Sequence, residues 1–125
     1  MFRFEESHKS MSKASDLTFM RTFSGGDPEK IKKYVGMFLK MAPPSMNQMD
    51  EFSQKMDWKS LKTTSHSLKS QMKYMGMALG AEFAQSIENI CSEGQGNEEI
   101  PTLLAKLRAQ VEQATTELED ELSKL

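Results

Sequence analysis

The chain has 125 residues, enough for one domain with a single hydrophobic core. Its 16 basic and 18 acidic side chains give a formal net charge of −2, so the chain as a whole has no basic signal for nucleic acid. The single cysteine, Cys91, excludes an intrachain disulfide, and no Cys/His cluster has the spacing of metal ligands. No segment has the apolar length of a membrane span, and the start lacks the apolar run of a signal peptide. We therefore expect a cytoplasmic protein that does not contact membranes.

The N-terminal region is polar, and we interpret residues 1–14 as a flexible arm or the end of a linker. Residues 15–125 would form the folded domain. His8 lies in the arm, where we expect it to be disordered. A short helix is expected at Asp16–Phe23, followed by a glycine-rich stop. The apolar residues of this helix that would cover one end of a bundle are Leu17, Met20 and Phe23.

Asp27-Pro28 is typical of a helix start, because aspartate caps the free amides and proline fits the first turn. Pro43 and Pro44 must break or kink this helix, since a proline ring removes a donor and crowds the previous turn. Ser45 could cap a continuation, and the sequence leaves open whether there is one kinked helix or two. The apolar positions at helical spacing are Ile31, Tyr34, Val35, Phe38, Ala42, Met46, Met49, Phe52 and Met56.

The next helix is expected to start after Asp57 as N-cap and to run to about Met75, with Gly76 in the turn that follows. With residues placed about 100° apart, its apolar positions share one side. His66 falls well away from that side, among lysines, so we expect a solvent-exposed histidine within a basic face. The apolar side comprises Trp58, Leu61, Ser65, Leu68, Met72 and Met75, and the lysines are Lys59, Lys62, Lys69 and Lys73.

The face around His66 suits a nucleophile for a phosphoryl group. A neutral imidazole nitrogen can attack phosphorus, and nearby ammonium groups attract an anionic donor and offset charge on the transferring oxygens. From periodicity alone, however, an ordinary surface histidine on a solvated lysine-rich face is the more frequent explanation.

Two further amphipathic helices follow. The first, at about 77–91, is expected to bury Leu79, Phe83, Ile87 and Ile90, with Cys91 packed near the same stripe. The second follows a polar loop, is capped by Asn97, and spans about 25 residues. Four long amphipathic helices with short loops predict an all-α fold. It would be an antiparallel, up-and-down four-helix bundle with a short extra N-terminal helix.

The segment His66-Ser67-Leu68-Lys69, with Gly76 ten residues after the histidine, resembles the signature of histidine-containing phosphotransfer (HPt) domains. In that family a lysine follows the histidine by three positions and a glycine by about ten. Ser70 stands where the family usually has glycine. Further matches lie at Gly25-Gly26-Asp27-Pro28, at Asp57-Trp58 and at Glu88, so the resemblance covers roughly residues 16 to 120.

The resemblance implies the same bundle and a place in a multistep two-component phosphorelay. His66 would accept a phosphoryl group from the aspartate of one receiver domain and pass it to another, with Lys69 as a nearby cation. The partners would be response-regulator receiver domains, including those of hybrid histidine kinases, and the chain itself is expected to be a monomer. An alternative is a non-catalytic helical adaptor that binds receiver domains without carrying phosphate.

The chain has no glycine-rich phosphate loop and no acidic metal cluster. We therefore expect a covalent phosphoryl carrier rather than an enzyme with its own ATP-dependent kinase activity. No cofactor is expected, and Mg²⁺ would be needed only in the partner receiver domain.

Helix geometry adds Glu88 to the predicted site. His66 lies ten residues before Gly76, or about 15 Å of helix, and Glu88 lies twelve residues after it, or about 18 Å. In an antiparallel hairpin the two side chains lie at similar heights. A carboxylate there would accept a hydrogen bond from one ring nitrogen and leave the other free, although an ordinary exposed glutamate remains the alternative. The predicted docking face around them comprises Lys59, Lys62, Ser70, Lys73, Met77, Ala81 and Ala84.

Overall fold

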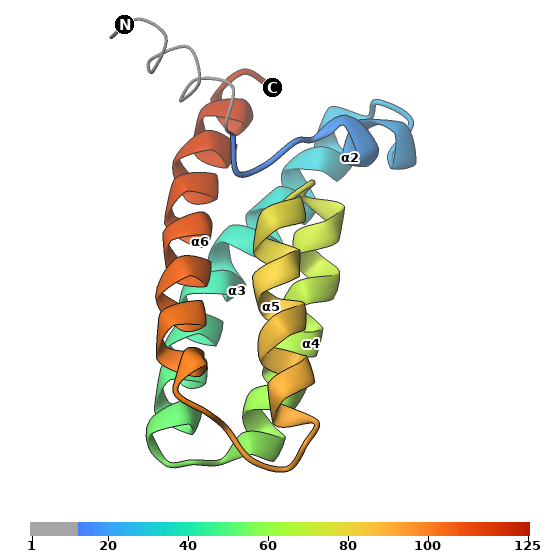
Figure 1. The fold of residues 1–125 in the computed structure, drawn as a ribbon. Helices are drawn as coiled ribbons and strands as arrows, with labels where there is room; N and C mark the ends of the chain where they lie inside the picture. The colour runs from blue at the N-terminus through green and yellow to red at the C-terminus, as the bar shows by residue number, and fades with distance from the viewer. Residues whose placement is uncertain (1–12) are drawn as a thin grey trace, which may run out of the picture.

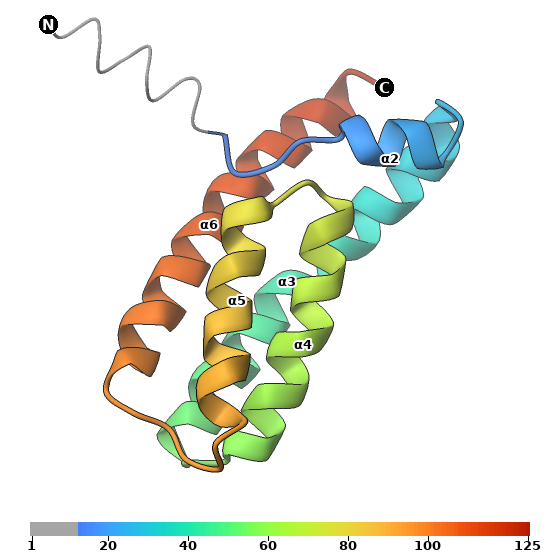
Figure 2. The same cartoon turned by 45° about the vertical axis from the view of Figure 1, so that its right-hand side comes forward.

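The structure of the chain, a computed structural model, describes residues 13–125. Most of the predicted arm, including His8, lies outside the described residues. Within the described part there are helices and no strands. The four long helices run up and down beside one another, and α2 crosses one end of them, the end at which the C-terminus also lies (Figures 1 and 2). The helices are α2 (Thr18–Phe23), α3 (Pro28–Gln54), α4 (Trp58–Tyr74), α5 (Ala78–Cys91) and α6 (Glu99–Ser123).

Helix α3 runs without interruption through its two internal prolines. Its N-terminus is capped as predicted, because the Asp27 carboxylate accepts a hydrogen bond from the Glu29 amide at 3.0 Å. The two prolines are exposed, whereas Ala42 and Met46 on the other side are buried. Packing of that apolar side holds the helix together across the missing hydrogen bonds, so the sequence forms one helix here and not two.

The core is formed by the apolar sides of the long helices, largely as the periodicity predicted. Three residues before α4 that were expected to be buried are exposed instead: Phe23 by 56%, Tyr34 by 36% and Met56 by 68%. Met56 has left the end of α3 and has a φ of 58° in the turn to α4, so the helical spacing no longer applies to it. The largest fully buried side chains are Met20, Ile31, Phe38, Met46, Met49, Leu61, Leu68, Met72, Met77, Ile87, Ile100 and Leu107.

The buried side of α5 differs from the predicted one. Leu79 is 47% exposed, and Phe83 and Ile90 are only half-buried. The helix is buried instead on a side rotated by about 100°, one residue's step. It packs against both α4 and α6, and small residues allow the close approach: a Cβ at Gly80 would come within 2.9 Å of the Met72 sulfur. The buried residues of α5 are Gly80, Ala81, Ala84, Ile87 and Cys91.

The segment that leads into α2 crosses the turn between α4 and α5. The Asp16 amide donates to the Met75 carbonyl at 3.0 Å, and a Cβ at Gly76 would lie 2.0 Å from the Asp16 carbonyl oxygen. Gly76 also has a φ of +66°. The turn therefore requires glycine for two reasons, its own backbone conformation and the chain that crosses it.

Glu117 on α6 anchors this crossing segment. Its carboxylate accepts hydrogen bonds from the Ala14 amide at 2.9 Å and from the Ser15 amide and hydroxyl at 2.8 and 2.6 Å. Ala14, which the sequence assigned to the arm, is only 5% exposed. The packed domain therefore includes it. Below, residues 14–17 are called the N-terminal strap.

Candidate functional site

His66 lies in the middle of α4 and points away from the core. The helix starts at a cap, because the Asp57 carboxylate accepts from the Ser60 amide at 3.2 Å. Hydrogen bonding to Ser60 holds the pKa of Asp57 below its ordinary value. Leu61 and Leu68 are buried on the core side of α4, whereas the side chain of His66 is 62% exposed. This is the exposure that the periodicity predicted.

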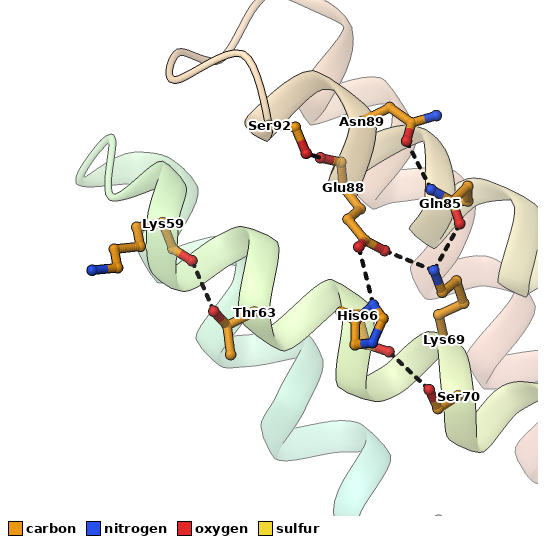
Figure 3. Close-up of polar contacts among 9 residues, drawn as sticks. All are labelled: Lys59, Thr63, His66, Lys69, Ser70, Gln85, Glu88, Asn89 and Ser92. Atoms are coloured by element: carbon orange, nitrogen blue, oxygen red, sulfur yellow. Dashed lines mark hydrogen bonds and ion pairs between the residues drawn. The ribbon is translucent and has the colours of Figure 1, made fainter.

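Glu88 of α5 lies between His66 and Lys69 and contacts both (Figure 3). Its Oε2 is 3.0 Å from the Nδ1 of His66, and its Oε1 accepts from the Lys69 ammonium at 2.8 Å. The hydrogen bond from Lys69, with a further one from His66, holds the pKa of Glu88 below its ordinary value against the opposing effect of burial. The Glu88 carboxylate is therefore an ionised hydrogen-bond acceptor at neutral pH.

An ionised carboxylate beside Nδ1 selects the ring tautomer. Because Glu88 can only accept, Nδ1 must donate, and in the neutral ring the lone pair then resides on Nε2 of His66. The ring is thus oriented on one side by α5 and open to solvent on the other. Such a nitrogen is positioned to act as a nucleophile toward a group that arrives from outside.

Lys69 does not belong to the solvated basic face on which the sequence put it. Its side chain is only 11% exposed, and its ammonium reaches across to α5, where it donates to Gln85 at 2.7 Å as well as to Glu88. Lysine can bury its methylene stem against apolar neighbours when its charged end finds partners. The predicted exposure of Lys69 is wrong because those partners come from another helix.

Two residues that the sequence analysis did not single out complete the polar cluster. Gln85 accepts from Lys69 through Oε1, and its Nε2 donates to the Asn89 side-chain oxygen at 2.7 Å (Figure 3). Gln85, Glu88 and Asn89 are spaced by three and four positions, so they share one side of α5. That spacing around Glu88 is the signal that would have found them.

The predicted docking residues fall into two groups. Lys59, Ser70 and Lys73 are exposed, and Lys62 is half-buried. The Ser70 hydroxyl donates to the carbonyl of His66 at 3.3 Å. For the second group the predicted role in docking is wrong, because these residues lie on the side of α5 and its entry turn that packs into the core. They are Met77 (0% exposed), Ala81 (7%) and Ala84 (0%).

Exposed apolar side chains gather instead where α2 meets α3 and α4. Phe23 lies 6.0 Å from Tyr74 and 6.2 Å from Tyr34 between ring centroids, and Phe19 stacks on Phe23 at 5.8 Å. We call these four residues the aromatic patch. They are 36–56% exposed, and three of them border a groove of about 400 Å³. Tyr74 is eight residues beyond His66 on α4, so the aromatic patch begins about 12 Å along the helix from the histidine.

Among residues 13–125, no three His, Cys, Asp or Glu side chains form a group that could hold a metal ion. None of the helices in the same range is long and apolar enough to cross a membrane. Cys91 is buried, and burial raises the pKa of its thiol, in keeping with the packing role expected for it.

The chain is a four-helix bundle that exposes a histidine beside a carboxylate and a lysine, and comparison with known proteins identifies its family. The family model of the Hpt domain matches residues 33–123, which is most of the chain. The chain therefore belongs to the Hpt domain family and is a phosphotransfer protein of a phosphorelay. This family consists of phosphoryl carriers that interact with receiver domains.

The fold is similar to that of a solved phosphotransfer protein. It is similar to the crystal structure of histidine-containing phosphotransfer protein B (HptB) from Pseudomonas aeruginosa PAO1, with a TM-score of 0.83 and 16% sequence identity. The match covers 91% of this chain and 98% of that one. At this identity the likeness concerns the fold, and it confirms the predicted all-α bundle. No curated protein matches the sequence.

Proposed function

We propose that His66 carries the phosphoryl group on Nε2, taking it from the aspartyl phosphate of one receiver domain and giving it to the aspartate of another. The observation that supports this most strongly is the contact between Glu88 and Nδ1, because it leaves Nε2 unprotonated and facing solvent. An exposed imidazole whose ring is oriented by a carboxylate from a neighbouring helix has the geometry of a nucleophile.

In the proposed step, the Nε2 lone pair attacks the phosphorus of the receiver's aspartyl phosphate. The N–P bond forms as the P–O bond to the aspartate breaks, and the aspartate leaves as a carboxylate. Nδ1 keeps its proton, so the phosphorylated ring of His66 is a cation. The Glu88 carboxylate, 3.0 Å from Nδ1, stabilises that cation. Transfer to a second receiver reverses these steps and returns a neutral ring.

Lys69 is proposed to supply positive charge to the same reaction. Its Nζ lies 2.8 Å from Glu88 and one helical turn from His66. In the resting protein it keeps Glu88 ionised, and during transfer it would offset charge on the phosphoryl oxygens. Mg²⁺ would be bound by the receiver domain, which would bring the acidic ligands that such an ion needs.

The receiver is proposed to dock over the exposed side of α4 around His66. Lys59, Lys62 and Lys73 would attract the acidic site of the receiver, and Ser70 lies one helical turn from His66, with its hydroxyl on the His66 backbone carbonyl. The aromatic patch would supply the apolar part of the docking surface, because Met77, Ala81 and Ala84 are buried. A cluster of exposed aromatic side chains is typical of protein interfaces.

The test is label transfer to two histidine variants. Receiver domains from the same genome are charged with ³²P-labelled acetyl phosphate, which is an acyl phosphate like the aspartyl phosphate it makes. The wild-type chain should take up label that survives base and is lost in acid, and His66→Gln should take up none while keeping its helical circular dichroism. His8→Gln is the matched control, since His8 is the other histidine of the chain, and it should label fully.

Acid-labile label on His66→Gln, or its loss from His8→Gln, would overturn the assignment. The alternative, an adaptor that binds receivers without carrying phosphate, predicts a complex with the receiver and no label on the wild-type chain.

A further inference from the structure

The hydrogen bonds around Lys69 extend beyond the groups that the proposed reaction uses. Lys69 donates to Gln85 at 2.7 Å, and Gln85 in turn donates to Asn89 at 2.7 Å (Figure 3). We propose that Gln85 is a positioning residue for phosphoryl transfer, which holds the Lys69 ammonium in place, and that Asn89 fixes the orientation of the Gln85 amide. This inference rests on the proposed function of His66.

The Lys69 ammonium needs partners outside its own side chain to hold it in place. A lysine ammonium sits on a flexible four-carbon stem and carries three N–H donors. Among the described residues, the structure gives this ammonium one acceptor from Gln85 and one from Glu88, both on α5. Two fixed N–H bonds determine where the charge lies and leave the third N–H for a phosphoryl oxygen. A cation that is already in place costs no reorganisation when the phosphoryl group arrives.

The Gln85 amide can hold Lys69 in only one of its two orientations. Its Oε1 faces the Lys69 ammonium only while its Nε2 faces Asn89. A flipped amide would turn its N–H donors toward a cation that has only donors of its own. Asn89 offers its Oδ1 to Nε2 and thereby favours the productive orientation. Asn89 is exposed and Gln85 half-buried, so neither is explained by the packing of the core.

A neutral acceptor suits position 85 better than a carboxylate. The charges of Lys69 and Glu88 balance each other, so the site offers an anionic donor a local cation without a surplus of negative charge. A second carboxylate at residue 85 would keep the hydrogen bond to Lys69 but give the cluster a net negative charge. It would then repel the incoming phosphoryl group.

The experiment compares Gln85→Met, which keeps the length of the side chain but accepts no hydrogen bond, with Gln85→Glu. Single-turnover transfer rates are measured at saturating receiver charged from labelled acetyl phosphate, and receiver affinity is measured separately. We expect Gln85→Met to slow transfer about five- to tenfold with affinity within about twofold, the loss of one hydrogen bond to a charged group. Gln85→Glu should be at least as slow. Gln110→Met, at a half-buried glutamine of α6, is the matched control and should transfer at the wild-type rate.

A double-mutant cycle with Lys69→Ala separates positioning from a merely structural role. If Gln85 acts through Lys69, Gln85→Met should slow the Lys69→Ala protein by less than about twofold. An equal slowing in both backgrounds would overturn the proposal, as would an unchanged rate in Gln85→Met alone. Asn89→Ala should give a smaller effect of the same kind, about two- to threefold, because the amide can still adopt the right orientation part of the time.

A second readout does not depend on phosphoryl transfer. ¹⁵N relaxation of the Lys69 ammonium in the unphosphorylated protein should show greater mobility in Gln85→Met than in the wild type or in Gln110→Met. Unchanged mobility would overturn the positioning role while leaving the function of His66 intact. A wild-type chain that takes up no label would instead overturn the proposed function, and the relaxation data would still decide whether Gln85 holds Lys69.

Discussion

Glu88 and Glu117 are both carboxylates that gather several hydrogen bonds between distant parts of the chain, yet they differ in what donates to them. Glu88 accepts from two side chains, His66 and Lys69. Glu117 accepts from the backbone and hydroxyl of the N-terminal strap and from Gln113. Burial raises the pKa of Glu117, but these hydrogen bonds outweigh it, so the pKa of each glutamate lies below its ordinary value.

The difference in donors distinguishes Glu88, to which we assign a role in the proposed function, from Glu117, which holds the fold together. Backbone amides cannot turn away or change their charge, so Glu117 fixes the N-terminal strap in one position across the end of the bundle. The donors to Glu88 are side chains on α4, and one of them, His66, is 62% exposed and would change charge in the proposed phosphoryl transfer. A lowered pKa is therefore no guide to function by itself, and the mobility and exposure of the partner groups decide which carboxylate serves chemistry.

The largest effect is expected where the N-terminal strap crosses the turn before α5. Gly76→Ala should lower the free energy of unfolding by more than about 3 kcal/mol, because an alanine pays for the positive φ and its Cβ would lie 2.0 Å from the Asp16 carbonyl oxygen. Gly94→Ala is the matched control: its φ is +83°, but nothing lies within 4 Å of the added Cβ. It should cost only about 1–2 kcal/mol in urea unfolding. Equal losses in the two variants would mean that the strap moves aside freely.

Next in size is the loss of the anchor itself. Glu117→Ala should cost about 2 kcal/mol of unfolding free energy, since it leaves the Ala14 and Ser15 amides without their acceptor. Transfer rates at saturating receiver should stay within about twofold of wild type. Glu112→Ala, at an exposed position of α6, should change neither quantity. A strong loss of transfer in Glu117→Ala would contradict the division drawn between the two glutamates.

Acid should remove the same stabilisation. Because the pKa of Glu117 is lower in the folded state than in the unfolded chain, its contribution is complete above the unfolded-state pKa and is lost as the pH falls through the folded-state pKa. The stability difference between wild type and Glu117→Ala should therefore shrink in acid, as urea unfolding at a series of pH values would record. A difference that stays constant down to about pH 2 would assign the effect to packing instead.

Lys69→Ala should differ from Glu117→Ala, because its main effect should be on the transfer rate. We expect the rate at saturating receiver to fall at least about tenfold, because the ammonium matters most while the phosphoryl group moves. Lys73→Ala removes an exposed lysine one turn further along α4. It should instead change the encounter rate and its salt dependence. Equal transfer rates in wild type and Lys69→Ala would remove Lys69 from the mechanism.

The sequence predicted well what is local to one helix. Caps such as Asp57 and the exposure of His66 follow from short-range spacing, and both are present in the structure. The buried side of α5 does not follow from such spacing, because the helix carries apolar residues on more than one side, and contact with two neighbours selects the small ones. The burial of Lys69 depends in the same way on acceptors from another helix.

The N-terminal strap lies beyond any local pattern. Its hydrogen bonds join Ser15 to Glu117 across 102 positions of sequence, and neither residue stands out among its neighbours. The only residue of the sequence analysis that reflects this contact is Gly76. The family resemblance includes a glycine at this position but does not explain why it is needed. The contact with the Asp16 carbonyl oxygen supplies that reason.

The smallest effect and the finest distinction concern Glu88→Gln. Both carboxylate oxygens of Glu88 are in use, whereas an amide has one acceptor and one donor end. The Lys69 ammonium is the stronger donor, so the amide oxygen should turn to it and leave the amide N–H facing Nδ1 of His66. This orientation favours the ring tautomer protonated at Nε2, which cannot attack phosphorus. Transfer should slow by about threefold, with a stability change within about 0.5 kcal/mol, because the two amide orientations compete.

The ¹⁵N shifts of the His66 ring, recorded at about pH 9 where a histidine is neutral, report the tautomer directly. Wild type should show the proton on Nδ1, and Glu88→Gln a shift toward Nε2. In Lys69→Ala/Glu88→Gln the amide oxygen is free to accept from Nδ1, so the wild-type tautomer should return even though the cation is gone. If the ring shifts were the same in wild type and Glu88→Gln, Glu88 would not select the tautomer. Its contact with His66 would then be as structural as that of Glu117 with the strap.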